Sequence, residues 1–225
     1  MTTSRSFVEL RALIFDFDGT IADTEAAEVD SVRAVFEAHG AALDHGLWQS
    51  VVGSDAGHGF WVPWLEDQVG PVVRDDVLFY ARSVNNELLA DLRPLPGVVD
   101  LLTEAADAGI AVAIASSAPL AWVDRHIQRL QIDHHFVAIR ARDHVEQAKP
   151  APDLYLSALE TLGISAQQAI AIEDSRNGSL AARAAGLRCV VVPNSTTAGQ
   201  DISHANAVLA SLAGVTLSQL LAMVA

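Results

Sequence analysis

Short apolar runs alternate with helical stretches over most of the chain. The apolar runs have four to six residues and lie at 12–15, 110–115, 169–172 and 187–192. Runs of this kind are typical of strands that are buried on both faces of a parallel sheet. Stretches with helical spacing, each followed by a glycine, lie at 98–108, 153–162 and 176–185. The repeated order of strand, loop and helix predicts an α/β fold with a doubly wound parallel sheet.

Residues 24–92 do not follow this pattern. They contain no run of the buried-strand kind, and they hold three of the four tryptophans. Helices are expected there at 23–39 and near 47–52, 60–69 and 72–92. We therefore interpret 24–92 as an inserted helical domain, and 1–23 together with 93–225 as the core domain that contains the sheet.

The net charge of the chain limits the classes of binding partner that are expected. The chain has 225 residues, of which 51% are hydrophobic, so it can bury one sizeable core and a smaller insert. It has 28 acidic residues against 14 Lys and Arg, a formal net charge of −14. Nucleic acids and anionic membranes require a basic face, so neither is an expected partner. An anionic substrate must be attracted by a few local cations.

Cysteine use and hydropathy indicate the compartment. The one cysteine, Cys189, lies in an apolar run, where a small core residue is more common than a nucleophile. Nowhere do eighteen apolar residues follow one another, and the first ten residues contain no apolar segment of a secretory signal. We expect a cytoplasmic protein and, by default for a domain with a small insert, a monomer.

The residues directly after the first strand carry the chemistry. Asp16 and Asp18 follow the apolar run 12–15, at the edge of a parallel sheet where ligands bind. The period of two in extended chain places both side chains on one side, and Gly19 allows the backbone to turn behind them. Because two such carboxylates repel each other, they favour a hard divalent cation, above all Mg2+.

The run DFDGTIADTE, residues 16–25, resembles the first motif of the haloacid dehalogenase-like hydrolase superfamily. The resemblance implies a Rossmann-like core and phosphoryl transfer. Asp16 is then the nucleophile that forms an aspartyl phosphate, and Asp18 is the general acid and base. Taken alone, the pattern would fit an Asx-rich turn that caps a helix equally well.

Two further motifs match the phosphate-binding positions of that superfamily. Ser116 and Ser117 follow the strand 110–115 and precede a helix, whose first amides are free to bind phosphate, although a serine there is more often a simple cap. Lys149 lies in KPAPDLY, which matches the third motif, whereas a lone lysine is usually a solvated charge. By resemblance, Ser116 and Lys149 bind the phosphate, with Ser117 beside them.

The fourth motif completes an acidic cluster. Glu173 and Asp174 follow the strand 169–172, and several carboxylates in one crevice without a cation would be costly. The resemblance implies that Asp16, the backbone carbonyl of Asp18 and Asp174 bind Mg2+ directly, and that Glu173 binds it directly or through water.

Within the superfamily, the helical insert after the first motif is similar to the beta-phosphoglucomutase-like branch, which contains sugar phosphatases and mutases. In its mutases, three basic residues hold the distal phosphate, and the matching positions here are Glu28, Asp55 and Pro119. None of them is basic. We therefore expect a Mg2+-dependent phosphatase for a small sugar or polyol phosphate. A phosphosugar mutase and a catalytically silent binding protein are the alternatives.

Substrate choice is expected to lie in the insert, which would close over the site as a cap. His58, in the glycine-rich turn 53–59, is a candidate substrate contact. Trp61 and Trp64 are three residues apart on one helical face, where packing is a more common role for tryptophan than binding a sugar.

Overall fold

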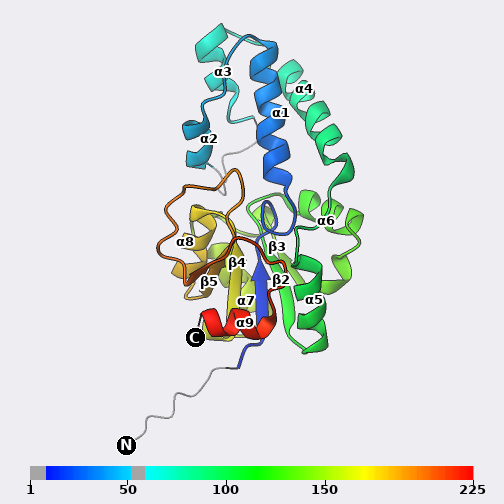
Figure 1. Ribbon diagram of the computed structural model, residues 1–225. Helices are drawn as coiled ribbons and strands as arrows, with labels where there is room; N and C mark the ends of the chain where they lie inside the picture. The colour runs from blue at the N-terminus through cyan, green and yellow to red at the C-terminus, as the bar shows by residue number, and fades with distance from the viewer. Residues whose placement is uncertain (1–8, 52–58, 225) are drawn as a thin grey trace, which may run out of the picture.

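The computed structural model describes residues 9–51 and 59–224. Its six parallel strands form one sheet in the order β3-β2-β1-β4-β5-β6 (Figure 1). The strands are β1 Ala12–Phe15, β2 Ala111–Ala115, β3 Ala138–Arg140, β4 Ala169–Glu173, β5 Arg188–Val191 and β6 Ala207–Val208. This sheet, with helices on both faces, confirms the expected doubly wound α/β fold.

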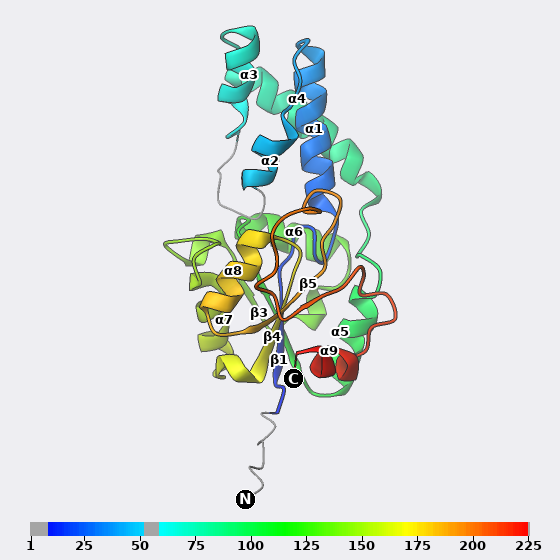
Figure 2. The same ribbon diagram turned by 60° about the vertical axis from the view of Figure 1, so that its left-hand side comes forward.

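Each face of the sheet is covered by its own helices. Helices α5 Val98–Asp107, α6 Leu120–Arg129 and α9 Leu217–Met223 pack on one face, and α7 Asp153–Leu162 and α8 Arg176–Ala184 on the other. Figure 2 shows α7 and α8 on the opposite side of the sheet from α5 and α9. The sheet is therefore dry on both faces, as the uninterrupted apolar runs predict.

The two faces differ in the size of their side chains. Successive strand residues point to opposite faces, so each strand contributes alternate residues to each core. Large residues such as Phe15, Ile114 and Ile172 face α5 and α6. Alanines such as Ala113 and Ala171 face α7 and α8, and this allows these two helices to lie close to the sheet.

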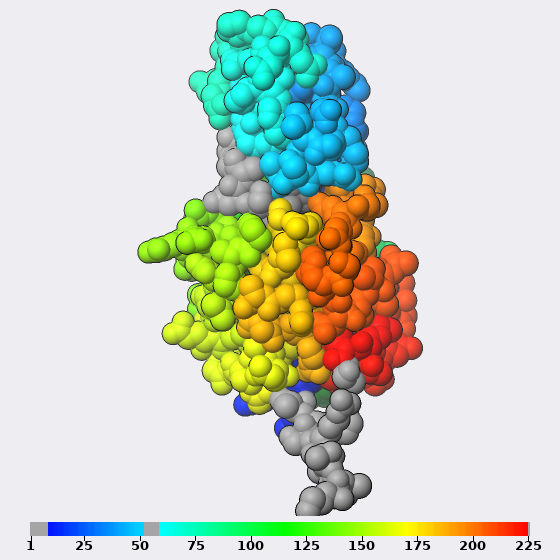
Figure 3. Space-filling view, turned by 90° about the vertical axis from the view of Figure 1, so that its left-hand side faces the viewer, coloured from blue at the N-terminus to red at the C-terminus, as the bar shows by residue number. Residues whose placement is uncertain are grey.

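Helices α1 Thr24–Ala38, α2 His45–Val51, α3 Val62–Val69 and α4 Arg74–Leu88 lie beyond the carboxyl edge of the sheet (Figure 1). The short helix η1 Leu89–Asp91 leads back to α5. Asp23 caps α1 by accepting a hydrogen bond from the Ala26 amide at 3.2 Å. The four helices form one lobe of the molecule, the upper lobe, and the sheet with its helices forms the other, the sheet lobe (Figure 3).

The upper lobe has a hydrophobic core of its own. Val32, Val35 and Phe36 of α1 pack against aromatic and aliphatic residues of α2, α3 and α4. Trp61 is 3% exposed and packs on Phe36, with ring centroids 6.3 Å apart. This is the packing role that the spacing of Trp61 and Trp64 predicted. Trp64 packs edge to face on Phe60, also within this lobe.

Most element boundaries lie within two residues of those expected from the sequence. The exception is the helix expected near 72–92, because α4 ends at Leu88 and the 3-10 helix η1 follows it. The 3-10 helix η2 Asp133–His135 precedes β3. Two more 3-10 helices, η3 Arg142–His144 and η4 Ala166–Gln168, precede α7 and β4. Cys189 is buried in β5, as expected. No helix in the described ranges is long and apolar enough to cross a membrane.

Candidate active site

The order of the strands places the candidate residues together. β1 lies in the middle of the sheet, with β2 and β3 on one side and β4, β5 and β6 on the other. A crevice forms where the connections diverge in this way, at the carboxyl ends of the central strands. Asp16 follows β1, Ser116 follows β2, and Glu173 ends β4. Lys149 arrives from the loop before α7.

A buried ion-pair network forms the floor of the crevice. The Lys149 ammonium donates to Asp16 and lies 2.6 Å from Glu173 Oε1. Tyr155 donates its hydroxyl to the same oxygen of Glu173 at 2.5 Å. The Lys149 side chain is 1% exposed and Glu173 is fully buried, so the pairing is shielded from water. Lys149 is thereby held beside the carboxylate of Asp16.

The electrostatics of Asp16 show a shortage of positive charge. Burial is the main cause that raises its pKa to about 7. Lys149 lowers the pKa, whereas the carboxylates of Glu173 and Asp18 raise it further. The two carboxylates that Lys149 contacts, on the other hand, raise the pKa of the lysine itself above its usual value, although burial opposes this. One lysine therefore does not compensate the acids around it.

Asp16, Glu173 and Asp174 each offer an oxygen within 4.8 Å of the others, and all three residues are buried. Burial raises the pKa of Asp174 well above its usual range, and the nearby carboxylates of Glu25 and Asp16 add to this. A set of buried carboxylate oxygens is the donor set that a hard divalent cation prefers. The cluster could therefore hold such a cation, which would relieve the repulsion.

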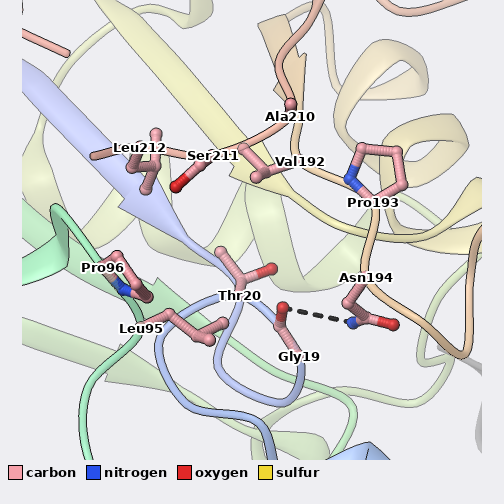
Figure 4. Close-up of a pocket in the computed structure, with 10 residues that line it drawn as sticks. All are labelled: Gly19, Thr20, Leu95, Pro96, Val192, Pro193, Asn194, Ala210, Ser211 and Leu212. Carbon is pink, nitrogen blue, oxygen red and sulfur yellow. Dashed lines mark hydrogen bonds between the residues drawn. The ribbon is translucent and has the colours of Figure 1, made fainter. Parts of the chain in front are cut away.

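Asn194 was not predicted as a site residue. Its side-chain amide donates to Asp174 Oδ2 at 2.7 Å and to the Gly19 carbonyl at 3.3 Å. Figure 4 shows the second of these bonds, with Asn194 and Gly19 in the lining of a cavity of about 210 Å³. None of the predicted site residues lines that cavity. The position of Asn194 just after β5 was the one signal in the sequence, because other candidates also follow strands.

Asp18 is held by donors from three elements. Thr24 Oγ1 donates to Oδ1 at 2.6 Å, and Trp122 Nε1 of α6 donates to the same oxygen at 2.8 Å. Ser116 Oγ approaches Oδ2 at 3.4 Å. The contact of Trp122 could not be expected from the sequence, because 104 residues separate it from Asp18. These bonds fix the carboxyl group at the mouth of the crevice.

The two serines differ. Ser116 is buried, and its hydroxyl accepts the Ala118 amide at 3.0 Å. Ser117 Oγ is buried too, but it has no hydrogen-bond partner among the described residues. Both serines line one large cavity, so a phosphate bound there could contact both of them.

A cavity of about 510 Å³ extends from the crevice to the helices of the upper lobe. Its lining includes Asp16, Asp18 and Ser116 from the sheet lobe, and Glu28 and Trp61 from the upper lobe. Asp55 and His58, the other predicted substrate contacts, lie outside the described residues.

The comparison of Glu28, Asp55 and Pro119 with the mutases did not identify all the charged residues of this cavity. Glu28 and Pro119 do line it, as acidic and neutral residues. Arg82 of α4, Arg125 of α6 and Arg142 of η3 line it as well. The sequence comparison overlooked these arginines because they come from helices whose relative placement it did not contain.

The sequence profile of a family described as haloacid dehalogenase-like hydrolase matches residues 13–192. The putative phosphatase YhcW of Bacillus subtilis is 38% identical over 216 residues, which cover 94% of this chain and 96% of that protein. Hexitol phosphatase B of Escherichia coli O157:H7 is 30% identical over 233 residues, which cover 98% of this chain and 100% of that protein.

Solved structures agree with this match. CbbY from Rhodobacter sphaeroides, crystallised with phosphate, superposes with a TM-score of 0.77 at 31% identity, over 94% of this chain and 99% of that one. A variant of the same protein was crystallised with xylulose-(1,5)bisphosphate, and it superposes with the same score, identity and coverage.

Proposed function

The chain belongs to the haloacid dehalogenase-like hydrolase family, and we propose that it is a Mg2+-dependent phosphatase that hydrolyses a small sugar or polyol phosphate through an aspartyl phosphate. The observation that carries this proposal is the buried pair of Asp16 and Lys149 at a cavity that Asp16 and Asp18 line. In the proposed reaction, Asp16 would be the nucleophile, Lys149 the cation that binds the phosphate, and Asp18 the proton carrier.

The donor set fits Mg2+. Asp16 and Asp174 would hold the ion, with the backbone carbonyl of Asp18, and Glu173 would support it directly or through water. Asn194, which donates to Asp174, would orient that ligand. When bound, the ion supplies charge that stabilises the phosphoryl oxygens in the transition state.

The residues of the chain perform the two steps. Asp16 Oδ attacks phosphorus, the bond from phosphorus to the ester oxygen breaks, and Asp18 gives its proton to the leaving alcohol. Lys149 and Ser116 hold the phosphoryl oxygens meanwhile. Asp18 then takes a proton from a water molecule that attacks the aspartyl phosphate, and this releases inorganic phosphate and restores Asp16.

Size and relatives support the substrate class. A cavity of about 510 Å³ lies in the range of small-molecule sites and accommodates a sugar phosphate. One relative is named a hexitol phosphatase, and another was crystallised with a sugar bisphosphate. Residues 24–92 would act as the cap domain that closes over the substrate and excludes water, while 1–23 and 93–225 form the core.

A phosphosugar mutase is the second candidate, because the arginines in the cavity could hold a second phosphate. A silent binding protein would not need Asp16, Asp18 and Lys149, and all three are present in the crevice.

The test measures phosphate release from a panel of sugar and polyol monophosphates with MgCl2 and with EDTA. Wild type is compared with Asp16→Asn and with Asp30→Asn, an exposed carboxylate of α1, as the matched control. We expect release to fall by on the order of 10^4-fold in Asp16→Asn and in EDTA, but not in Asp30→Asn. Conversion of glucose 1-phosphate to glucose 6-phosphate without net release would favour the mutase. Equal release by wild type and Asp16→Asn would refute both.

A further inference from the structure

Two arginines in the large cavity have no role in the proposed chemistry. Arg82 of α4 and Arg125 of α6 both line it. Neither makes a hydrogen bond or an ion pair within the described part of the chain, although the chain has twice as many acidic as basic residues. Both residues are exposed, so their guanidinium groups are available to an anionic ligand in the cavity that they line.

Hydrogen bonds connect α6 to the segment that follows α4. Arg129 Nη2 of α6 donates to the carbonyls of Leu89 and Ala90, which follow α4, at 2.5 Å each. Arg125 lies one turn before Arg129, on the same face of α6. Arg82 lies two turns before Leu89 on α4. These bonds join α6 to η1, and Arg82 and Arg125 line the same cavity.

Asn85, one turn from Arg82 on α4, lines the same cavity. Its Oδ1 is buried and has no hydrogen-bond partner among the described residues. An oxygen buried without a partner is costly, so a partner is expected in the occupied state. Two exposed arginines and an unpartnered amide oxygen thus line the same cavity.

Charge is distributed unevenly around the cavity. Carboxylates gather at the ends of the strands and on the first turns of α1, as Asp16, Asp18, Glu25 and Glu28. The arginines come instead from α4, α6 and η3. A substrate whose phosphate ester lies on Asp16 could therefore extend from the carboxylates toward these arginines. A guanidinium group binds planar or tetrahedral oxyanions through two parallel hydrogen bonds.

We propose that Arg82 and Arg125 bind a second anionic group of the substrate, and that the preferred substrate is a sugar phosphate that carries a second phosphate or a carboxylate. This proposal rests on the phosphatase function above and specifies its substrate class. Asn85 accepts a hydrogen bond from a hydroxyl group of the same substrate. The arginines contribute to substrate specificity, and the residues at the strand ends carry out the reaction.

The experiment compares pairs of substrates that differ in the second anion. One pair is fructose 1-phosphate and fructose 1,6-bisphosphate, which tests a second phosphate. The other is glucose 6-phosphate and 6-phosphogluconate, which tests a carboxylate. For each pair, the ratio of kcat/KM for the compound with two anionic groups to that for the monophosphate is measured with MgCl2. Wild type is compared with Arg82→Gln/Arg125→Gln and with Arg33→Gln, an exposed arginine of α1 that does not line the cavity.

We expect the ratio of at least one pair to exceed one in wild type and to fall by about tenfold or more in the double variant, because it loses two charge-assisted sites. The pair that responds identifies the second anion. Arg33→Gln keeps the ratio of the wild type. Ratios that stay within twofold of wild type in the double variant, for both pairs, overturn the proposal while phosphate release itself still supports the phosphatase.

Direct binding provides a readout that does not depend on turnover. Calorimetric titration of Asp16→Asn with fructose 1,6-bisphosphate and MgCl2 is compared with the same titration of Asp16→Asn/Arg82→Gln/Arg125→Gln. A rise in Kd of about tenfold supports the second subsite even if wild type releases no phosphate, in which case only the proposed reaction fails. An unchanged Kd overturns the subsite.

Discussion

The two ends of the large cavity differ in how their polar side chains are paired. At the end formed by the sheet, Lys149 contacts Asp16 and Glu173, Asn194 bonds Asp174, and donors from separate elements hold Asp18. At the end formed by α4 and α6, Arg82 and Arg125 have no partner among the described residues. Burial differs in the same way, because Asp16, Lys149, Glu173 and Asp174 are buried and both arginines are exposed.

The difference separates chemistry from recognition. Groups that must stabilise a transition state act best when they are held in place before the substrate arrives, and buried bonds provide this. Groups that read the rest of a substrate gain more when their bonding capacity is used only on binding, because no internal bond has to be broken first. The sheet end is consistent with the first role and the wall of α4 and α6 with the second.

Removal of the cation from the sheet end should disturb the molecule most. In Lys149→Met, the buried carboxylates of Asp16 and Glu173 lose their shared partner. We expect the free energy of unfolding in EDTA to fall by about 3–5 kcal/mol, the range for breaking a buried ion pair on one side. Urea unfolding followed by circular dichroism measures this.

The matched control is Arg33→Gln, which removes an arginine from an ion pair whose side chains are about half exposed, 46% and 48%. We expect a change within about 0.5 kcal/mol there. A loss below about 1 kcal/mol in Lys149→Met would show that the carboxylates find other compensation, and that the network is less rigid than its bonds indicate.

The bond that holds Asp18 from α6 can be removed without removing a carboxylate. Trp122→Phe deletes the indole donor to Asp18, and we expect kcat to fall by roughly 10- to 100-fold with KM changed much less, because Asp18 acts in the chemical steps. Steady-state kinetics with the best substrate of the panel separates the two constants.

Trp48 offers a close comparison. It also lines the cavity, but its Nε1 has no hydrogen-bond partner in the described ranges, so Trp48→Phe removes a ring of the same size and no bond. Equal losses of kcat in the two variants would mean that ring volume matters and the bond to Asp18 does not.

The smallest expected effect tests how tightly Glu173 is enclosed. A Cβ atom at Gly178 of α8 would lie 2.0 Å from Glu173 Oε2, which cannot move without disturbing Lys149 and Tyr155. Gly→Ala usually stabilises a helix by about 0.5–1 kcal/mol. Here we expect the opposite sign, a loss of about 1–2 kcal/mol by thermal or urea unfolding.

Gly46→Ala in α2 is the control, because its nearest neighbour is the exposed side chain of Asp44 at 3.2 Å. We expect it to be neutral or slightly stabilising. Stabilisation by Gly178→Ala of the same size as in the control would show that Glu173 has room to move.

Sequence reasoning was most successful for features that depend on residues close together in the chain. The buried runs predicted every long strand, because a strand covered on both faces has no polar position to obscure the pattern. The first motif placed Asp16 and Asp18 correctly at the end of β1, since both are adjacent in sequence to the strand that positions them. The roles assigned to these residues stay predictions until the variants above are measured.

Sequence reasoning did not predict contacts between segments that are far apart in the chain. Trp122 and Asn194 bond the acidic groups across 104 and 20 residues, and no spacing rule connects such positions. The comparison of Glu28, Asp55 and Pro119 with the mutases considered single positions, and so it missed the arginines of α4 and α6. A cavity between two lobes is lined by residues from many segments, whereas a sequence pattern describes one segment at a time.

The order of apolar and polar residues was thus sufficient to specify the strands, the helices and the loops in which the four motifs lie, because these depend on neighbours within a few residues. Folding of the whole chain decided which charges are paired and which remain available. The tertiary structure brings Lys149 to Asp16, and it places Arg82 and Arg125, from α4 and α6, in the lining of one cavity. Pairing of charges depends on distances across the molecule, and only the packed structure defines those distances.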